Sequence, residues 1–211
     1  MIRRAAFLVA AILWVVPQAA SAALAADLRA GYAIPYGKIS GDADLASFVQ
    51  GHVPLGVDLR WRFTPRFSAG AYLSYGFGVL SDSRAGKCRV LGAECTASDL
   101  RTGLEAELQL SEGWKVTPYL SARVGWESFA FEEDAGVSWS RTRYYGWELG
   151  AEGGATLLER GALRVGAFLG VTGGSFYGYG ARGPGLDASG SITDRALHGW
   201  FTVGVRAAIA P

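Results

Sequence analysis

The sequence contains no asparagine among its 211 residues, so it offers no acceptor for N-linked glycosylation. Charged residues make up only 18% of the chain, which is below the roughly 25% of an average soluble domain. The formal net charge is +1, so the chain lacks the basic excess that is typical of nucleic-acid-binding proteins. We therefore expect no nucleic-acid partner, and we expect a fold in which apolar surface is unusually abundant.

The chain also lacks an apolar run long enough for a membrane-spanning helix, which needs about 20 residues. The apolar stretch at residues 5–16 is too short, and it follows the basic pair Arg3 and Arg4. Small residues come next, with A-x-A patterns at residues 20–22 and 23–25. These features predict a cleavable signal peptide over residues 1–25 and an exported domain over residues 26–211. A buried N-terminal helix is the alternative.

Cysteine is limited to Cys88 and Cys95, which lie in a polar stretch. In an exported protein this spacing favours a disulfide that closes a loop. A metal site would need more cysteine or histidine nearby than the sequence offers, so we expect neither a metal nor a cofactor.

Period-two alternation of apolar and polar residues is the pattern that dominates the exported part. The run at 99–110 is the most regular, with Leu100, Leu104 and Leu108 on one face and Glu105 and Glu107 on the other. The pattern predicts an all-β fold with eight strands, at about 27–36, 53–63, 67–79, 99–110, 116–130, 145–157, 163–172 and 197–209.

The connections between these runs alternate in length. Three are tight turns, at 64–66, 111–114 and 159–161. Four are long and polar, at 37–52, 81–97, 132–141 and 178–195. This alternation is typical of an antiparallel up-and-down meander with turns at one end and loops at the other.

The polar faces of the runs combine many glycines and serines with long charged residues, whereas glycine weakens a solvated strand. A narrow eight-stranded barrel does need small residues inside it. We therefore expect the polar face to line the lumen and the apolar face to meet lipid, as in a closed transmembrane barrel. Solvated strand faces are the alternative reading.

The lumen is thus predicted to hold a balanced ion-pair network, because buried charges need partners and arginine pairs well with carboxylates. The predicted members are the acids Asp58, Asp99, Glu105, Glu107, Glu127, Glu148 and Glu152 and the bases Arg29, Arg60, Arg62, Arg101, Arg123, Arg164 and Arg206.

Outward aromatic residues form two groups, as expected for the girdles of a membrane barrel. The group expected near the loops is Tyr36, Tyr75, Phe77, Trp126, Tyr145, Trp147 and Phe201. The group expected near the turns is Trp61, Phe63, Phe67 and Trp114.

With this architecture, residues 27–211 resemble the small eight-stranded outer-membrane barrels of Gram-negative bacteria, the OmpA-, OmpW- and opacity-like group. The fragment VTPYLSARVGW at 116–126 is similar to a strand of such domains. The resemblance implies location in the cell outer membrane, contact with membrane lipids and lipopolysaccharide, insertion by the outer-membrane assembly machinery, and a monomer whose extracellular loops meet a ligand.

The function expected from these features is non-enzymatic, with a structural, adhesive or envelope-stabilising role exerted through four long extracellular loops. A narrow channel for small or hydrophobic solutes is the alternative. A lipid-modifying enzyme would need His198 near an acid (Asp58, Glu148 or Glu152) and a serine (Ser74 or Ser121). A soluble lipocalin-like binder is a further alternative, and it would require apolar residues inside the barrel.

Overall fold

The computed structural model describes residues 24–111, 116–136 and 138–209. The predicted signal peptide lies outside this part of the chain except for its last two residues. Leu24 and Ala25 already belong to the first strand, so the predicted domain boundary at residue 25 falls inside that strand. Trp114, predicted for the turn-side girdle, also lies outside the described residues.

The described chain consists almost entirely of strands. Its elements are β1 (Leu24–Ser40), β2 (Ala43–Asp44), η1 (Leu45–Ser47), β3 (Val49–Arg62), β4 (Phe67–Leu80), α2 (Asp82–Leu91), β5 (Glu94–Gln109), β6 (Thr117–Asp134), β7 (Trp139–Arg160), β8 (Leu163–Gly183), β9 (Leu186–Ser191) and β10 (His198–Ile209). No helix in the described part of the chain is long and apolar enough to cross a membrane.

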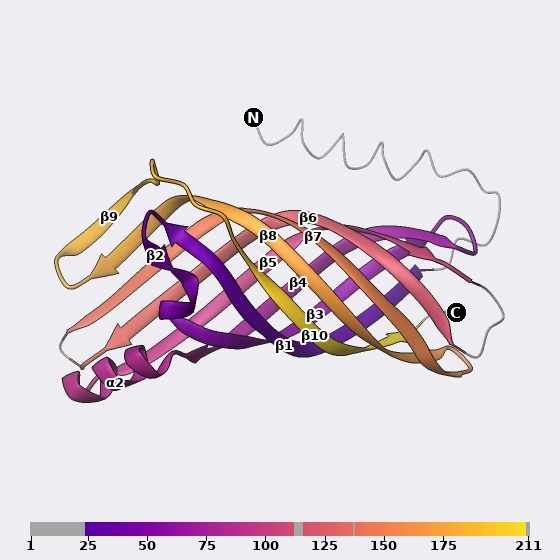
Figure 1. The fold of residues 1–211 in the computed structure, drawn as a ribbon, viewed down its shortest axis with the longest axis horizontal. Helices are drawn as coiled ribbons and strands as arrows, with labels where there is room; N and C mark the ends of the chain where they lie inside the picture. The colour runs from indigo at the N-terminus through magenta and orange to yellow at the C-terminus, as the bar shows by residue number, and fades with distance from the viewer. Residues whose placement is uncertain (1–23, 112–115, 137, 210–211) are drawn as a thin grey trace, which may run out of the picture.

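Eight of these strands close into a ring, which Figure 1 shows as a barrel of tilted strands. Neighbours in sequence pair antiparallel from β1 through β3, β4, β5, β6 and β7 to β8. Strand β10 then pairs with β8 on one side and with β1 on the other, which closes the ring. The predicted all-β, eight-stranded, antiparallel up-and-down barrel is confirmed. Closure leaves the ring without a free edge, as a membrane-spanning sheet requires.

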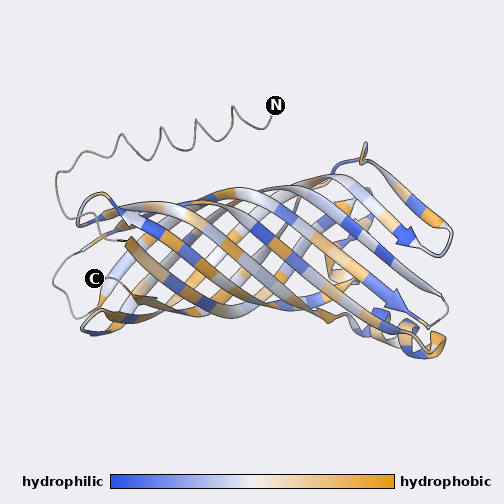
Figure 2. Cartoon of the chain, turned by 180° about the vertical axis from the view of Figure 1, so that it is seen from behind, coloured by the Kyte–Doolittle hydropathy of each residue, from blue (hydrophilic) through white to orange (hydrophobic). Residues whose placement is uncertain are grey.

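The apolar face of each strand points outward. Leu28, Leu104, Leu169 and Val205 are each more than half exposed, while the charged residues between them are buried. Figure 2 shows the corresponding alternation of apolar and polar bands along the strands of the barrel wall. A belt of exposed leucine and valine of this extent is stable only against lipid, so the structure places the inside of the barrel where the sequence pattern predicted it.

The short-turn end is built from tight connections. Between β7 and β8, Gly161 adopts a left-handed φ of 60°, which lets Arg160 and Leu163 pair directly across a two-residue turn. Between β3 and β4, the Thr64 side chain accepts hydrogen bonds from the backbone N–H groups of Arg66 and Phe67.

The opposite, long-loop end is more ordered than the sequence pattern predicted. Strands β6 and β7 remain paired up to Asp134 and Trp139, so the predicted polar loop at 132–141 is mostly an extension of the barrel wall. Strand β9 similarly pairs with the end of β8, where a loop from residue 178 was expected. The helix α2 lies within the predicted loop at 81–97. These segments extend beyond the barrel on the left of Figure 1.

Candidate functional site

The lumen of the barrel is the candidate functional site, and its charged side chains lie in three successive layers. In the layer nearest the short turns, Arg60 binds both Asp27 and Glu107. Arg206 binds the same carboxylate of Glu107 and lies over the ring of Tyr119 at 3.8 Å from its centroid. The shared carboxylate joins β3, β5 and β10, so this layer ties distant strands together.

The middle layer centres on Arg29. Its guanidinium binds Asp58, lies 2.5 Å from an Oε atom of Glu152 and 3.4 Å from Glu105. Arg123 binds Glu105 and lies 3.6 Å from both Asp58 and Glu152. Two guanidinium groups are thus held by three carboxylates from β3, β5 and β7, and every member is buried or half-buried.

The third layer surrounds Arg101, which is buried in the half of the lumen nearer the long-loop end. Its guanidinium lies 2.6 Å from Asp99, 3.4 Å from Glu127 and 3.6 Å from Glu148. It also lies 5.2 Å from the ring centroid of Trp200. Three carboxylates thus converge on one guanidinium, and the buried ring of Trp200 covers one side of it.

Two buried histidines flank this layer, whereas the sequence pattern indicated only His198. The Nε2 atom of His198 lies 2.7 Å from Glu127, and its ring stacks on Phe176 at 3.9 Å. Trp200 donates its indole N–H to the same Glu127. The second histidine, His52, lies 3.8 Å from Asp99. His52 precedes the alternating run of β3, which is why its inward direction was not predicted.

An apolar cluster closes the lumen above the third layer. Phe176 and Trp200 are fully buried within it, and Phe129 is almost so. Its other members are Ala33, Ile39, Leu45, Val49, Cys88, Ala97, Phe131 and Ile192. We call these eleven residues the apolar cap. The cap was not predicted from the sequence, and it separates the charged layers from the long-loop end.

The structure differs from the predicted network at three positions. Asp27 was not among the predicted members, yet it is fully buried and bound to Arg60. Arg164 instead forms an exposed pair with Glu159, 3.0 Å away beside the β7–β8 turn. Arg62 is half-buried near the short turns and joins none of the ion pairs formed within the described part of the chain. Both arginines lie near the short-turn end of the barrel, and neither forms an ion pair with a lumen acid within the described residues.

The predicted balance of seven acids and seven bases is therefore wrong. Among the described residues, the three layers hold eight carboxyl groups against five guanidinium groups, and two buried histidines lie beside them. The acids are Asp27, Asp58, Asp99, Glu105, Glu107, Glu127, Glu148 and Glu152, and the arginines are Arg29, Arg60, Arg101, Arg123 and Arg206.

The predicted girdle residues that the structure describes, which leaves out Trp114, point away from the lumen. Near the short turns, Trp61, Phe63 and Phe67 are exposed, and the rings of Phe63 and Phe67 lie 6.0 Å apart. The exposed members of the other group are Tyr75, Phe77, Trp147 and Phe201, and the half-buried ones are Tyr36, Trp126 and Tyr145. Tyr32 and Tyr177 also face outward, although neither was among the predicted girdle residues.

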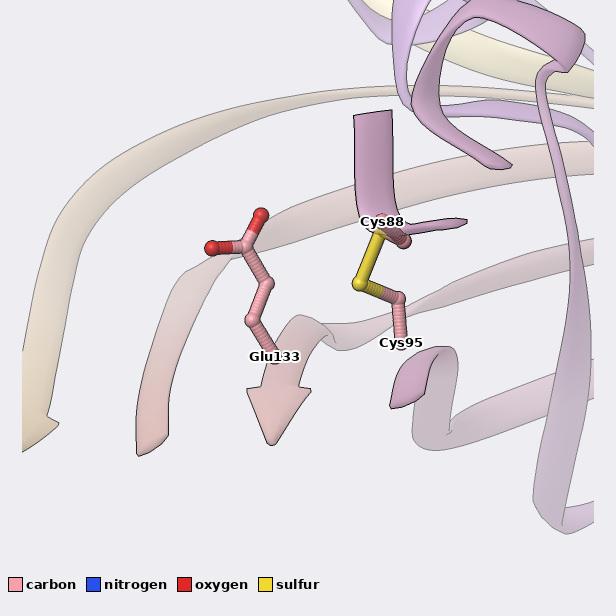
Figure 3. A group of neighbouring side chains, drawn as sticks. All are labelled: Cys88, Cys95 and Glu133. Carbon is pink, nitrogen blue, oxygen red and sulfur yellow. A yellow bond between two sulfur atoms is a disulfide. The ribbon is translucent and has the colours of Figure 1, made fainter. Parts of the chain in front are cut away.

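The predicted disulfide between Cys88 and Cys95 is confirmed, and Figure 3 shows it beside Glu133. It joins the last turn of α2 to the start of β5. Glu133 lies close enough to complete a set of three metal-ligating atoms. While the sulfur atoms bond to each other they are not thiolates, and Glu133 faces Arg84 at 3.7 Å. The arrangement is therefore that of a structural bridge.

The candidate catalytic residues are not brought together. The carboxylate that contacts His198 is Glu127, and not Asp58, Glu148 or Glu152. Within the described residues neither Ser74 nor Ser121 forms a hydrogen bond to His198. Nucleophilic catalysis needs serine and base in direct contact, so the lumen does not have the arrangement of a serine hydrolase.

A cavity of about 50 Å³ lies beside the middle and third layers, lined among others by His52, Tyr72, Arg123 and Glu148. A water molecule needs roughly 10–15 Å³ measured this way, so the space suits a few water molecules. The buried Oε2 of Glu148 and Nη2 of Arg123 lack hydrogen-bond partners in the described part of the chain. This cavity is suited to hydrating the network and is too small for a sugar or a lipid chain.

No protein-family model and no curated protein matches the chain. Solved structures do share its fold. The Neisserial surface protein A matches with a TM-score of 0.54 at 14% identity, over 87% of this chain and 95% of that protein. A major outer membrane protein from Thermus thermophilus matches with a TM-score of 0.63 at 11% identity, over 91% of this chain and all of that protein. The closed ring, the lipid-facing belt and this shared fold make the chain a small β-barrel of the outer-membrane type.

Proposed function

We propose that this protein is a non-enzymatic barrel of the outer membrane that conducts no solute and acts through its long-loop end, in a structural, adhesive or envelope-stabilising role. The observation that carries this proposal is the apolar cap lying over three cross-linked layers of charge. An ion or solute would have to break several buried ion pairs and displace Trp200 and Phe176 to pass. Each buried pair costs about 3–5 kcal/mol to break, so the closed state is strongly favoured.

The long-loop end supports a role in contact with other molecules. There β6 and β7 extend the barrel wall, and α2 is held by the disulfide between Cys88 and Cys95. Ordering these segments costs conformational entropy, which bridges and strand pairing offset. A preorganised surface of this kind suits an adhesive or stabilising role better than mobile loops do.

The proposal includes the partners that a membrane barrel requires. We propose that the exposed aliphatic belt contacts lipid, that the long-loop end faces the cell exterior and its lipopolysaccharide, and that the assembly machinery inserts the chain as a monomer. The closed ring supports a monomer because its eight strands leave no edge within the membrane wall for a second copy, β9 lying outside the ring.

Planar-bilayer recording tests the proposal. The purified chain, shown to be folded by its heat-dependent shift in gel mobility, should give no steady conductance steps, while a general porin inserted under the same conditions should. A reproducible open step from the folded protein would contradict the closed lumen and favour the narrow channel.

A further inference from the structure

The outer wall beyond the loop-side girdle carries a group of arginines that the lumen network does not use. On β7, Arg141 and Arg143 follow Tyr145 and Trp147 in steps of two residues, so all four lie on the outward face. Arg143 therefore lies about 7 Å beyond Tyr145 along the strand. Arg182 on β8 shares this face, because it is the direct cross-strand partner of Arg141. We call these three arginines the basic patch.

The charges of the basic patch are only partly balanced. Arg141 lies 2.8 Å from Glu132 on β6, and Arg182 lies 3.6 Å from Asp187 on β9, where both side chains are more than two-thirds exposed. Arg143 is exposed and has no acidic partner within the described residues. Like charges placed directly opposite on two strands repel each other, and Glu132 and Asp187 offset this repulsion between Arg141 and Arg182. Arg143 is therefore the charge of the basic patch that is left without compensation in the described part of the chain.

The basic patch lines a shallow hollow of about 380 Å³ on the outer wall. Gly180 is the cross-strand partner of Arg143 and forms part of the floor of the hollow, where the hydroxyl of Tyr145 lies over it. Trp139 and Tyr145 line the hollow as well, and Ser189 adds a hydroxyl group. The hollow thus combines three guanidinium groups with one carboxylate, that of Asp187, and adds aromatic rings and a hydroxyl group. This excess of positive charge in a polar and aromatic lining suits a phosphorylated sugar better than a bare acyl chain.

From this geometry we propose that the basic patch binds the phosphate groups of a phosphorylated glycolipid in the outer leaflet. This proposal rests on the proposed function, because it uses the orientation given there, in which the long loops face the cell exterior. In that orientation the hollow lies just beyond the aromatic belt, at the depth of lipid headgroups. Guanidinium groups bind phosphate at two points and stay charged, which is the chemistry required there.

The test measures retention of bis-phosphorylated lipid A on the immobilised, detergent-solubilised full chain. The double variant Arg143→Gln/Arg182→Gln should retain it at least about tenfold more weakly, because the loss of even one charge-assisted contact is worth about a tenfold change. The control Lys87→Gln/Arg89→Gln removes two exposed charges from α2 at the same end of the barrel and should bind like the original chain. The single variant Arg143→Lys keeps the charge and should bind better than Arg143→Gln.

Three results would overturn the proposal. Equal retention by both double variants would show that the basic patch is not the site. Equal retention of enzymatically dephosphorylated lipid A would show that phosphate is not recognised. Binding of inorganic phosphate as tightly as lipid A, with the two compared in the same assay, would assign the patch to a free anion instead of a lipid. Conductance recorded from the same preparations distinguishes failure of the proposed function from failure of the basic patch. An open conductance step would contradict the closed lumen, but it would not affect the conclusion drawn from lipid A retention.

Discussion

The hydroxyl of Tyr72 on β4 donates a 2.6 Å hydrogen bond to Oε1 of Glu148 on β7, between two strands that are not neighbours in the ring. Both side chains are almost fully buried. The bond therefore acts as a strut across the lumen. It also supplies a donor to an acid whose other oxygen has no hydrogen-bond partner in the described part of the chain.

Replacing Tyr72 by phenylalanine should lower the free energy of unfolding by about 1–3 kcal/mol, because it leaves a buried carboxylate oxygen without its donor. Urea unfolding of the protein in lipid vesicles, followed by tryptophan fluorescence, measures the change. Tyr75→Phe is the matched control, since Tyr75 faces lipid and contacts Phe77. An equal loss in both variants would mean that the Tyr72 strut contributes nothing of its own.

Glu107→Gln should destabilise the barrel more strongly than the loss of the Tyr72 bond does. Glu107 binds both Arg60 and Arg206, and Arg206 would be left with Asp27 at 4.0 Å as its remaining acid. A buried charge that loses its partner costs about 3–5 kcal/mol. The same unfolding assay should show a loss of at least about 3 kcal/mol.

The control for this variant is Glu159→Gln, which breaks the exposed pair with Arg164. Exposed ion pairs contribute about 0–1 kcal/mol to stability, so this change should leave the free energy of unfolding almost unchanged. Comparable effects of Glu107→Gln and Glu159→Gln would show that water reaches the lumen and screens its charges.

The wall of the barrel was predictable because two environments act on alternate residues. In β5, lipid selects leucine at 100, 104 and 108, while the lumen selects acids at 105 and 107. Beyond the girdle both faces of the strands meet polar surroundings, as at Glu133 and Ser140, which are direct cross-strand partners on β6 and β7. The period-two alternation of hydropathy therefore disappears there, although the backbone pairing of the two strands continues. The strand extensions could therefore not be read from hydropathy.

Helix α2 did carry local signals that went unused. Ser81 accepts a hydrogen bond from the backbone N–H of Arg84, and Gly92 ends the helix in a left-handed conformation. A capping serine and a terminal glycine are the usual signals for the two ends of a helix. The helix was missed because its ten residues have no clear apolar face, and Cys88 is the residue they bury.

The lumen was predicted less completely than the wall because the type of a residue there does not always indicate whether its side chain points into the barrel or out of it. Trp200 resembles a girdle residue by type, yet it shares the inward face of β10 with His198. Asp27 lies one residue from outward-facing Leu28, so alternation alone would have included it. Partner choice within the layers depends on how eight strands close, which a single sequence does not reveal.

Removing the disulfide should free α2 without opening the barrel. In Cys88→Ser/Cys95→Ser the helix keeps the contacts of Arg84 with Phe48 and Phe131 but loses its covalent tie to β5. We expect trypsin to cleave after Lys87 and Arg89 several times faster, because local opening limits proteolysis. The heat-dependent gel shift should persist, since the bridge spans only seven residues at one end of the barrel.

Limited proteolysis with mass spectrometry of the fragments checks this expectation. Unchanged cleavage would show that the aromatic contacts of Arg84 hold the helix by themselves. Loss of the gel shift would instead show that the bridge is needed for barrel formation.

Two adjacent glycines offer the sharpest test of which face is inside. Gly154 lies on the lumen face, where a Cβ atom would collide with the ring and hydroxyl of buried Tyr119. Gly153 faces lipid, and its Cβ would meet Leu120 at 3.5 Å, an ordinary contact. Gly154→Ala should therefore cost about 1–3 kcal/mol of stability by overpacking, and Gly153→Ala should stay within about 0.5 kcal/mol of the original chain. The opposite ranking in the unfolding assay would mean that β7 is turned around, with its leucines inside and its glutamates outside.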